Sequence, residues 1–169
     1  MYHGGILVGS LKCNFENLPF NFVIDTTTAD WTVTNNGTLT VTSSALTLKK
    51  DGVNTSIATY YTTVPITEGC TLNLEGTVKY STSSASEGSS YSAVGKVQVS
   101  KDGSTWETLV EKTATAAAGK ASASATIAST IDMSAYAGYN CYFRVAANNT
   151  RAANGTYSTL TLTAFNLTY

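Results

Sequence analysis

The aromatic residues are the best candidates for ligand binding in this chain of 169 residues, because the usual combinations of catalytic residues are missing. The only histidine, His3, lies in a glycine-rich N-terminal segment. There is no Ser-His-Asp set, HExxH motif or P-loop. The acidic residues are spread singly rather than as the carboxylate pair that glycoside hydrolysis requires. The sequence therefore predicts a protein that is not an enzyme, with no catalytic residues and no cofactor.

Aromatic rings remain as candidates for ligand binding, since a flat ring can stack on the apolar face of a sugar, and Trp31 and Trp106 are two of them. Tyr60, Tyr61, Tyr91, Tyr139 and Tyr157 share this capacity. Tyr91 follows the Ser-rich stretch STSSASEGSS and Tyr157 follows a turn-rich one, so we expect both on the surface. We interpret Tyr91 and Tyr157 as the candidate ligand-contacting residues.

The charge pattern excludes several classes of partner. Ten basic and eleven acidic residues give a net charge of −1, and the basic residues are scattered, so the chain lacks the basic field of a nucleic-acid-binding protein. No apolar run is long enough to span a membrane. Charged residues make up only 12% of the chain, and Ser and Thr dominate its polar positions. The surface is therefore expected to be rich in hydroxyl groups.

The three cysteines, Cys13, Cys70 and Cys141, are far apart and form no CxxC motif. We predict reduced thiols, at least two of them in the core, with no metal site; one disulfide and a leftover thiol is the alternative. Reduced thiols and the absence of a recognisable signal peptide fit assembly in a cytoplasm.

Strand patterns predict the elements that would position these side chains. Residues 70–80 alternate strictly, with Cys70, Leu72, Leu74, Val78 and Tyr80 on one face. Residues 94–110 predict a β-hairpin whose Asp102-Gly103 turn has positive φ at both positions. Residues 132–138 predict one helical turn ending at Gly138, and a change of phase near Ala164 predicts a β-bulge.

Frequent turn signals between nine to eleven short strands predict an all-β fold, an antiparallel β-sandwich of the jelly-roll type. The Ala-rich residues 112–121 are expected to form a loop. Residues 1–30 are interpreted as an N-terminal arm and a first strand, and residues 31–169 as the sandwich domain. Ile6, Leu7, Val8 and Leu11 are the apolar residues of the arm, which Gly4, Gly5 and Gly9 make adaptable.

Three motifs in order carry a family resemblance: FENLPF at 15–20 followed by Trp31, VQVSKDGSTWETL at 97–109, and IDMSAYAGYNCYFRV at 131–145. The chain resembles the galactose-binding-like jelly-roll domains of the cleaved-adhesin, MAM and carbohydrate-binding-module type. The resemblance implies that Trp31 and Trp106 pack in the core or at its edge. It also implies a structural calcium between Glu16 and the last strand, where Asn166 replaces the expected Asp and argues against the metal.

Two functions fit these observations. The favoured one is a structural protein of a phage virion, a decoration, auxiliary capsid or head-fibre protein assembled in the host cytoplasm. Its arm, Ile6, Leu7, Val8 and Leu11, would bind a capsid or fibre scaffold, and other virion proteins or further copies of the chain would be its partners. The alternative is a carbohydrate-binding module or adhesin domain of a secreted bacterial protein, with a glycan as the partner.

Overall fold

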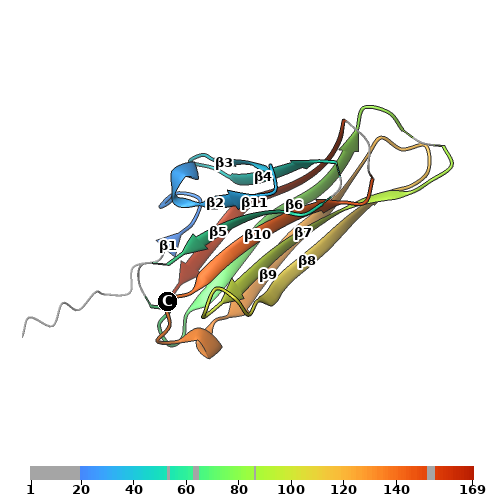
Figure 1. Cartoon of the computed structure of the whole chain (residues 1–169). Helices are drawn as coiled ribbons and strands as arrows, with labels where there is room; N and C mark the ends of the chain where they lie inside the picture. The colour runs from blue at the N-terminus through green and yellow to red at the C-terminus, as the bar shows by residue number, and fades with distance from the viewer. Residues whose placement is uncertain (1–19, 53, 63–64, 86, 152–154) are drawn as a thin grey trace, which may run out of the picture.

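Two antiparallel sheets packed face to face form the protein, as the computed structural model shows (Figure 1). The structure describes residues 20–52, 54–62, 65–85, 87–151 and 155–169. The predicted arm residues Ile6, Leu7, Val8 and Leu11, together with Cys13 and Glu16, lie outside the described residues. Within the described residues there are eleven strands and two short 3-10 helices, which confirms the all-β prediction.

The six-stranded sheet has the order β3-β4-β11-β6-β9, and β1 pairs with one end of β11. Its strands are β1 (Phe20–Asn21), β3 (Thr38–Val41), β4 (Leu46–Asp51), β6 (Thr71–Thr82), β9 (Ser122–Asp132) and β11 (Thr156–Thr168). The long strands β6 and β11 lie side by side at its centre, so the interior of the sandwich is built mainly on these two.

The five-stranded sheet has the order β2-β5-β10-β7-β8. Its strands are β2 (Thr32–Thr34), β5 (Ser56–Tyr61), β7 (Tyr91–Ser100), β8 (Glu107–Ala116) and β10 (Tyr142–Asn149); the 3-10 helices are η1 (Thr28–Asp30) and η2 (Ser134–Tyr136). The chain passes repeatedly from one sheet to the other, as in the jelly-roll sandwich that the sequence predicts.

Alternating side chains fill the space between the sheets. Leu72, Leu74 and Val78 of β6 are fully buried, which confirms the face predicted from residues 70–80. An aromatic cluster lies at one end of the interior, where the ring centroids of Phe22 and Phe165 are 4.1 Å apart. Trp31 is also buried, as the family resemblance implies, whereas Trp106 is half-buried and is not among the core residues.

The hairpin of β7 and β8 is present, but its turn differs from the prediction. Gly103 has a φ of +74°, whereas Asp102 is not among the residues with positive φ. The Asp102 carboxylate instead accepts the backbone N–H groups of Ser104 and Thr105 at 2.8 and 2.7 Å. This arrangement shapes a longer turn of the Asx type, so the prediction of two positive φ values was wrong.

The loop expected over residues 112–121 is also partly wrong, because β8 continues to Ala116. Ala114 and Ala116 are buried while Thr113 and Thr115 are exposed, so the segment alternates as a strand does. Pairing with Tyr91–Gly95 of β7 decides its conformation over its weak local preference. The bulge predicted near Ala164 is confirmed by a register shift between Leu162 and Ala164.

Cys70 and Cys141 are both buried and free, which confirms the predicted burial. Burial raises the pKa of the Cys141 thiol to about 11, so little reactive thiolate forms at neutral pH.

We expect the native Cys13→Ser variant to react slowly with a thiol reagent at pH 8, because both remaining thiols are enclosed. Denaturant should release two reactive thiols, counted by the absorbance of the released chromophore. Equal labelling rates with and without denaturant would contradict the burial of Cys70 and Cys141.

Candidate binding face of the five-stranded sheet

A row of polar side chains crosses the outer face of the five-stranded sheet. The register aligns Thr32 with Thr59, Thr59 with Arg144, Arg144 with Gln98, and Gln98 with Thr108. Side chains alternate along each strand, and the neighbours of Arg144 on β10, Phe143 and Val145, are fully buried. The row therefore points away from the core and toward solvent.

Arg144 is held in place by contacts on two sides. Its Nε–H donates to Oε1 of Gln98 at 2.8 Å, and Nε2 of Gln98 in turn donates to Oγ1 of Thr108 at 2.8 Å. The guanidinium carbon lies 4.0 Å from the centre of the Trp106 ring. Partial burial lowers the pKa of Arg144 from its usual value, but an arginine remains charged. The outer nitrogens of a guanidinium fixed in this way are available to acceptors on a ligand.

A pair of tyrosines adjoins this row at the end where β5 stops. Tyr61 and Tyr142 are directly opposed in register, and their ring centroids are 4.4 Å apart at an interplanar angle of 38°. Tyr61 is 46% exposed, so one side of the pair faces solvent. A Cβ added to Gly103 would lie 3.2 Å from the Tyr142 ring, which shows how closely the hairpin turn covers that ring.

The hairpin turn places Trp106 beside the row. Asp102 accepts hydrogen bonds from the backbone of Thr105 and Ser104 and from the Ser100 hydroxyl. These bonds, that of the Thr105 backbone foremost, hold the pKa of Asp102 well below its usual range. The turn is thus kept in one shape by an ionised carboxylate, and Trp106 follows it directly. We call Tyr61, Gln98, Trp106, Tyr142 and Arg144 the platform.

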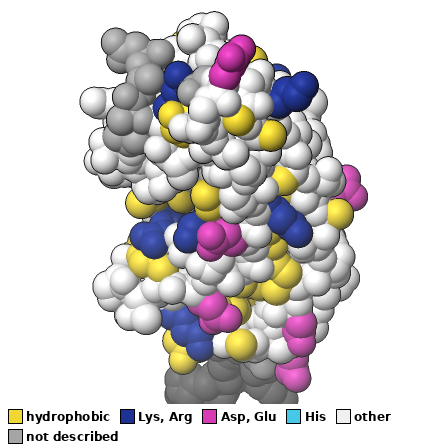
Figure 2. Space-filling view, turned by 90° about the vertical axis from the view of Figure 1, so that its right-hand side faces the viewer, with side chains coloured by type: hydrophobic (Ala, Val, Ile, Leu, Met, Phe, Trp, Pro, Cys, Tyr) yellow, Lys and Arg dark blue, Asp and Glu magenta, His cyan; other side chains and the backbone are white. Residues whose placement is uncertain are grey.

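One ion pair lies beside the platform. Lys96 of β7 lies opposite Glu111 of β8, next to the Gln98–Thr108 pair. Its Nζ is 2.9 Å from Oε2 of Glu111. On the face drawn in Figure 2, basic and acidic side chains are interspersed among a majority of uncharged ones. The face drawn there thus presents no field of one sign, in agreement with the balanced charge of the sequence.

The two tyrosines proposed from the sequence are not part of the platform, and they belong to different sheets. Tyr157 belongs to β11 in the six-stranded sheet, and Nζ of Lys49 lies 3.8 Å from its ring centre. The Tyr91 ring stacks on buried Tyr80 at 6.4 Å and lies 4.8 Å from the Arg151 guanidinium. The structure brings neither into a shared site, and their role as ligand contacts stays a prediction.

The calcium implied by the resemblance is not tested by the described residues, because one of its two proposed ligands lies outside them. Oδ1 of Asn166 is buried and has no hydrogen-bond partner among the described residues, while Glu16 is not described. Over the described ranges, no three His, Cys, Asp or Glu side chains lie close enough to hold a metal ion. In the same part of the chain, no helix is long and apolar enough to cross a membrane.

Comparison with known proteins gives a distant similarity of fold. No protein-family model and no curated protein matches the chain. A structure described as "CBM4 structure and function" has a TM-score of 0.48 at 16% identity, covering 82% of this chain and 94% of its own. The N-terminal cellulose-binding domain of Cellulomonas fimi β-1,4-glucanase C has a TM-score of 0.47 at 15% identity, covering 86% and 92%.

A third similar structure is the C-terminal family 22 carbohydrate-binding module of Clostridium thermocellum Xyn10B. Its TM-score is 0.43 at 14% identity, covering 87% of this chain and 91% of its own. These three structures are described as carbohydrate- or cellulose-binding modules.

Proposed function

We propose that this protein is a non-catalytic carbohydrate-binding module that binds a glycan chain across the platform. The observation that carries the proposal is the fixed Arg144, hydrogen-bonded to Gln98 and stacked on Trp106, beside half-buried Tyr142 and exposed Tyr61. Binding sites for small molecules and sugars combine apolar or aromatic surface with a few oriented polar groups, and the platform has both.

Each part of the platform has a distinct task in this proposal. The tyrosine rings offer apolar surface to the C–H groups of a pyranose ring. The Arg144 guanidinium donates to sugar hydroxyl oxygens in a fixed orientation, because Gln98 and Trp106 hold it before the ligand arrives. Groups that are already ordered lose less conformational entropy on binding.

The hypothesis of a phage virion protein has no support among the described residues. Its attachment segment, Ile6, Leu7, Val8 and Leu11, lies outside them. The glycan proposal, in contrast, depends only on side chains whose contacts are described.

Replacing Tyr142 or Arg144 with alanine is expected to weaken glycan binding by about tenfold or more, as loss of a central aromatic or arginine contact does in other interfaces. Soluble xylan and cellulose-derived oligosaccharides are the first probes, because xylan and cellulose are named for similar structures. Affinity gel electrophoresis and calorimetry give the dissociation constants, after a glycan array has chosen the ligand.

Tyr157→Ala is the competing variant, since it removes a tyrosine proposed from the sequence that lies in the other sheet; if the platform is the binding site, its affinity is unchanged. If Tyr157→Ala abolishes binding while Tyr142→Ala does not, the platform is the wrong site. If the wild-type protein binds no glycan on the array, the proposed function is wrong.

A further inference from the structure

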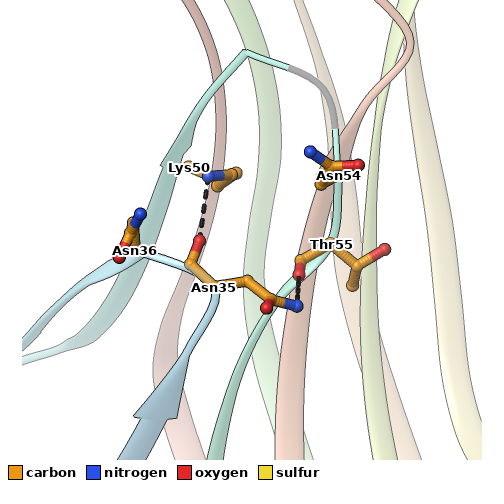
Figure 3. A pocket seen from close by; sticks show the side chains of 5 residues that line it. All are labelled: Asn35, Asn36, Lys50, Asn54 and Thr55. Atoms are coloured by element: carbon orange, nitrogen blue, oxygen red, sulfur yellow. Dashed lines mark hydrogen bonds between the residues drawn. The ribbon is translucent and has the colours of Figure 1, made fainter.

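A polar pocket opens at the edge of the sandwich, where the chain passes from the five-stranded to the six-stranded sheet. It has a volume of about 460 Å³ and is lined by Asn35, Asn36, Lys50, Asn54 and Thr55. Figure 3 shows Lys50 between Asn36 on one side and Asn54 on the other, with Asn35 and Thr55 beneath. The lining contains one positive charge and no acidic side chain.

Lys50 is unusual because it occupies a core position of β4. It follows Leu46 and Leu48 on the buried face and is only 9% exposed. Its ammonium donates to the Asn35 carbonyl oxygen at 2.9 Å, which uses one of three N–H groups. Among the described residues the only ion pair joins Lys96 to Glu111, so Lys50 has no carboxylate there. A buried ammonium without a counter-charge is costly, and an anion in the pocket would offset that cost.

The turns that form the walls of the pocket have a defined backbone conformation and are joined by a hydrogen bond. Asn35 and Asn36 have φ values of 58° and 54°, and Asn54 has a φ of 84°, the left-handed conformation that asparagine tolerates better than most residues. Nδ2 of Asn35 donates to the Thr55 carbonyl at 2.8 Å and ties the two walls together (Figure 3). At Gly37 a Cβ would lie 1.7 Å from Oγ of Ser56, so the turn can sit this close to β5 only with glycine.

We propose that this pocket binds the carboxylate of an acidic sugar, a uronic acid. The Lys50 ammonium binds the carboxylate. The side-chain amides of Asn36 and Asn54 can both donate and accept hydrogen bonds, as the neighbouring sugar hydroxyls require. The volume is in the range of small-molecule sites and suits one sugar ring. An anion follows from the charge of the pocket; the choice of a sugar carboxylate as that anion rests on the proposed function.

The pocket is separate from the platform, so the two sites can be tested independently. They lie at opposite ends of β5, which spans about 17 Å between Ser56 and Tyr61 at the usual rise of a strand. A monosaccharide in the pocket therefore cannot reach Tyr61 or Tyr142.

The test is a titration of the ¹⁵N-labelled protein with sodium glucuronate, followed by amide chemical shifts. Glucose, sodium acetate and sodium sulfate at matched ionic strength are the comparison ligands. Glucuronate is expected to shift the amide resonances of Asn35, Asn36, Asn54 and Thr55 in a saturable manner. Its dissociation constant is expected to be at least tenfold lower than those of the other three ligands.

Lys50→Met is expected to weaken glucuronate binding at least tenfold while the fold persists, because an apolar chain of similar length fits a buried position. Lys49→Met is the matched control, since the adjacent lysine is exposed and points away from the core. Asn54→Gly provides a second variant that removes one amide while still allowing positive φ, and it should weaken binding several-fold. Thermal unfolding confirms that each variant is folded.

Several results would overturn the proposal. Equal binding of sulfate or glucose would show that the pocket does not recognise a carboxylate, and unchanged binding by Lys50→Met would show that Lys50 is not the partner. Equal binding of acetate would refute the sugar as carrier. Tyr142→Ala should bind glucuronate normally, so a failure of the platform and a failure of the pocket give different results.

Discussion

Replacing Phe165 with alanine is expected to lower the free energy of unfolding by about 3–5 kcal/mol, the range for large aromatic residues in a core. Phe165 is fully buried, its ring stacks on Phe22 at 4.1 Å, and the rings of Phe143 and Trp31 lie 5.9 and 6.4 Å away. These neighbours come from β10 and from the segment after β1, so the cavity would open between separate elements. Urea unfolding followed by tryptophan fluorescence measures the change.

Tyr139→Ala is the control for this prediction. Tyr139 is 49% exposed, so its loss should change the free energy of unfolding by less than about 0.5 kcal/mol. If Phe165→Ala lowers the free energy of unfolding less than Tyr139→Ala does, the aromatic cluster does not stabilise the sandwich.

Gly76→Ala is expected to destabilise the protein by about 3 kcal/mol or more, at the upper end of the cost of overpacking. An added Cβ would lie 2.1 Å from the Thr161 carbonyl oxygen and 3.0 Å from the Leu162 Cα, both backbone atoms of the neighbouring strand. The β11 bulge begins at this point, so β11 has moved toward β6 and leaves room only for hydrogen. Either β11 must shift or the pairing must break.

Gly88→Ala is the matched control, because a Cβ there would meet nothing within 4 Å and Gly88 has no positive φ. Thermal unfolding of both variants measures the difference. Equal melting temperatures for Gly76→Ala and Gly88→Ala would contradict the close approach of β6 and β11.

The fold was predictable where alternation is strict. Leu72, Leu74 and Val78 recur at a period of two, and only a strand with one buried face explains that period. The same reasoning failed at residues 112–116, because alternating Ala and Thr have little preference of their own and the partner strand decides. It failed again at Asp102, whose side-chain acceptor replaced the expected backbone geometry.

The platform was only partly predictable. The alternation along β10 directs Tyr142 and Arg144 outward, and that signal is visible in the sequence. What the sequence does not show is the partner of each residue across strands, since Tyr61, Gln98 and Trp106 come from segments distant along the chain. The Lys50 pocket could not be predicted for the same reason. The role of a lysine at a core position is clear only once the structure shows the Asn35 turn beside it.

The place of β11 in its sheet has a consequence for how the protein is made. β11 lies between β4 and β6 and leaves the ribosome well after both of them. Until it arrives, the six-stranded sheet is divided into two halves with unpaired edges, and the aromatic cluster lacks Phe165. The nascent chain must therefore wait in an open form, and pairing of such distant segments is slow. During synthesis, the unpaired edges of β4 and β6 are therefore exposed to other unfolded chains until the thirteen residues of β11 have emerged.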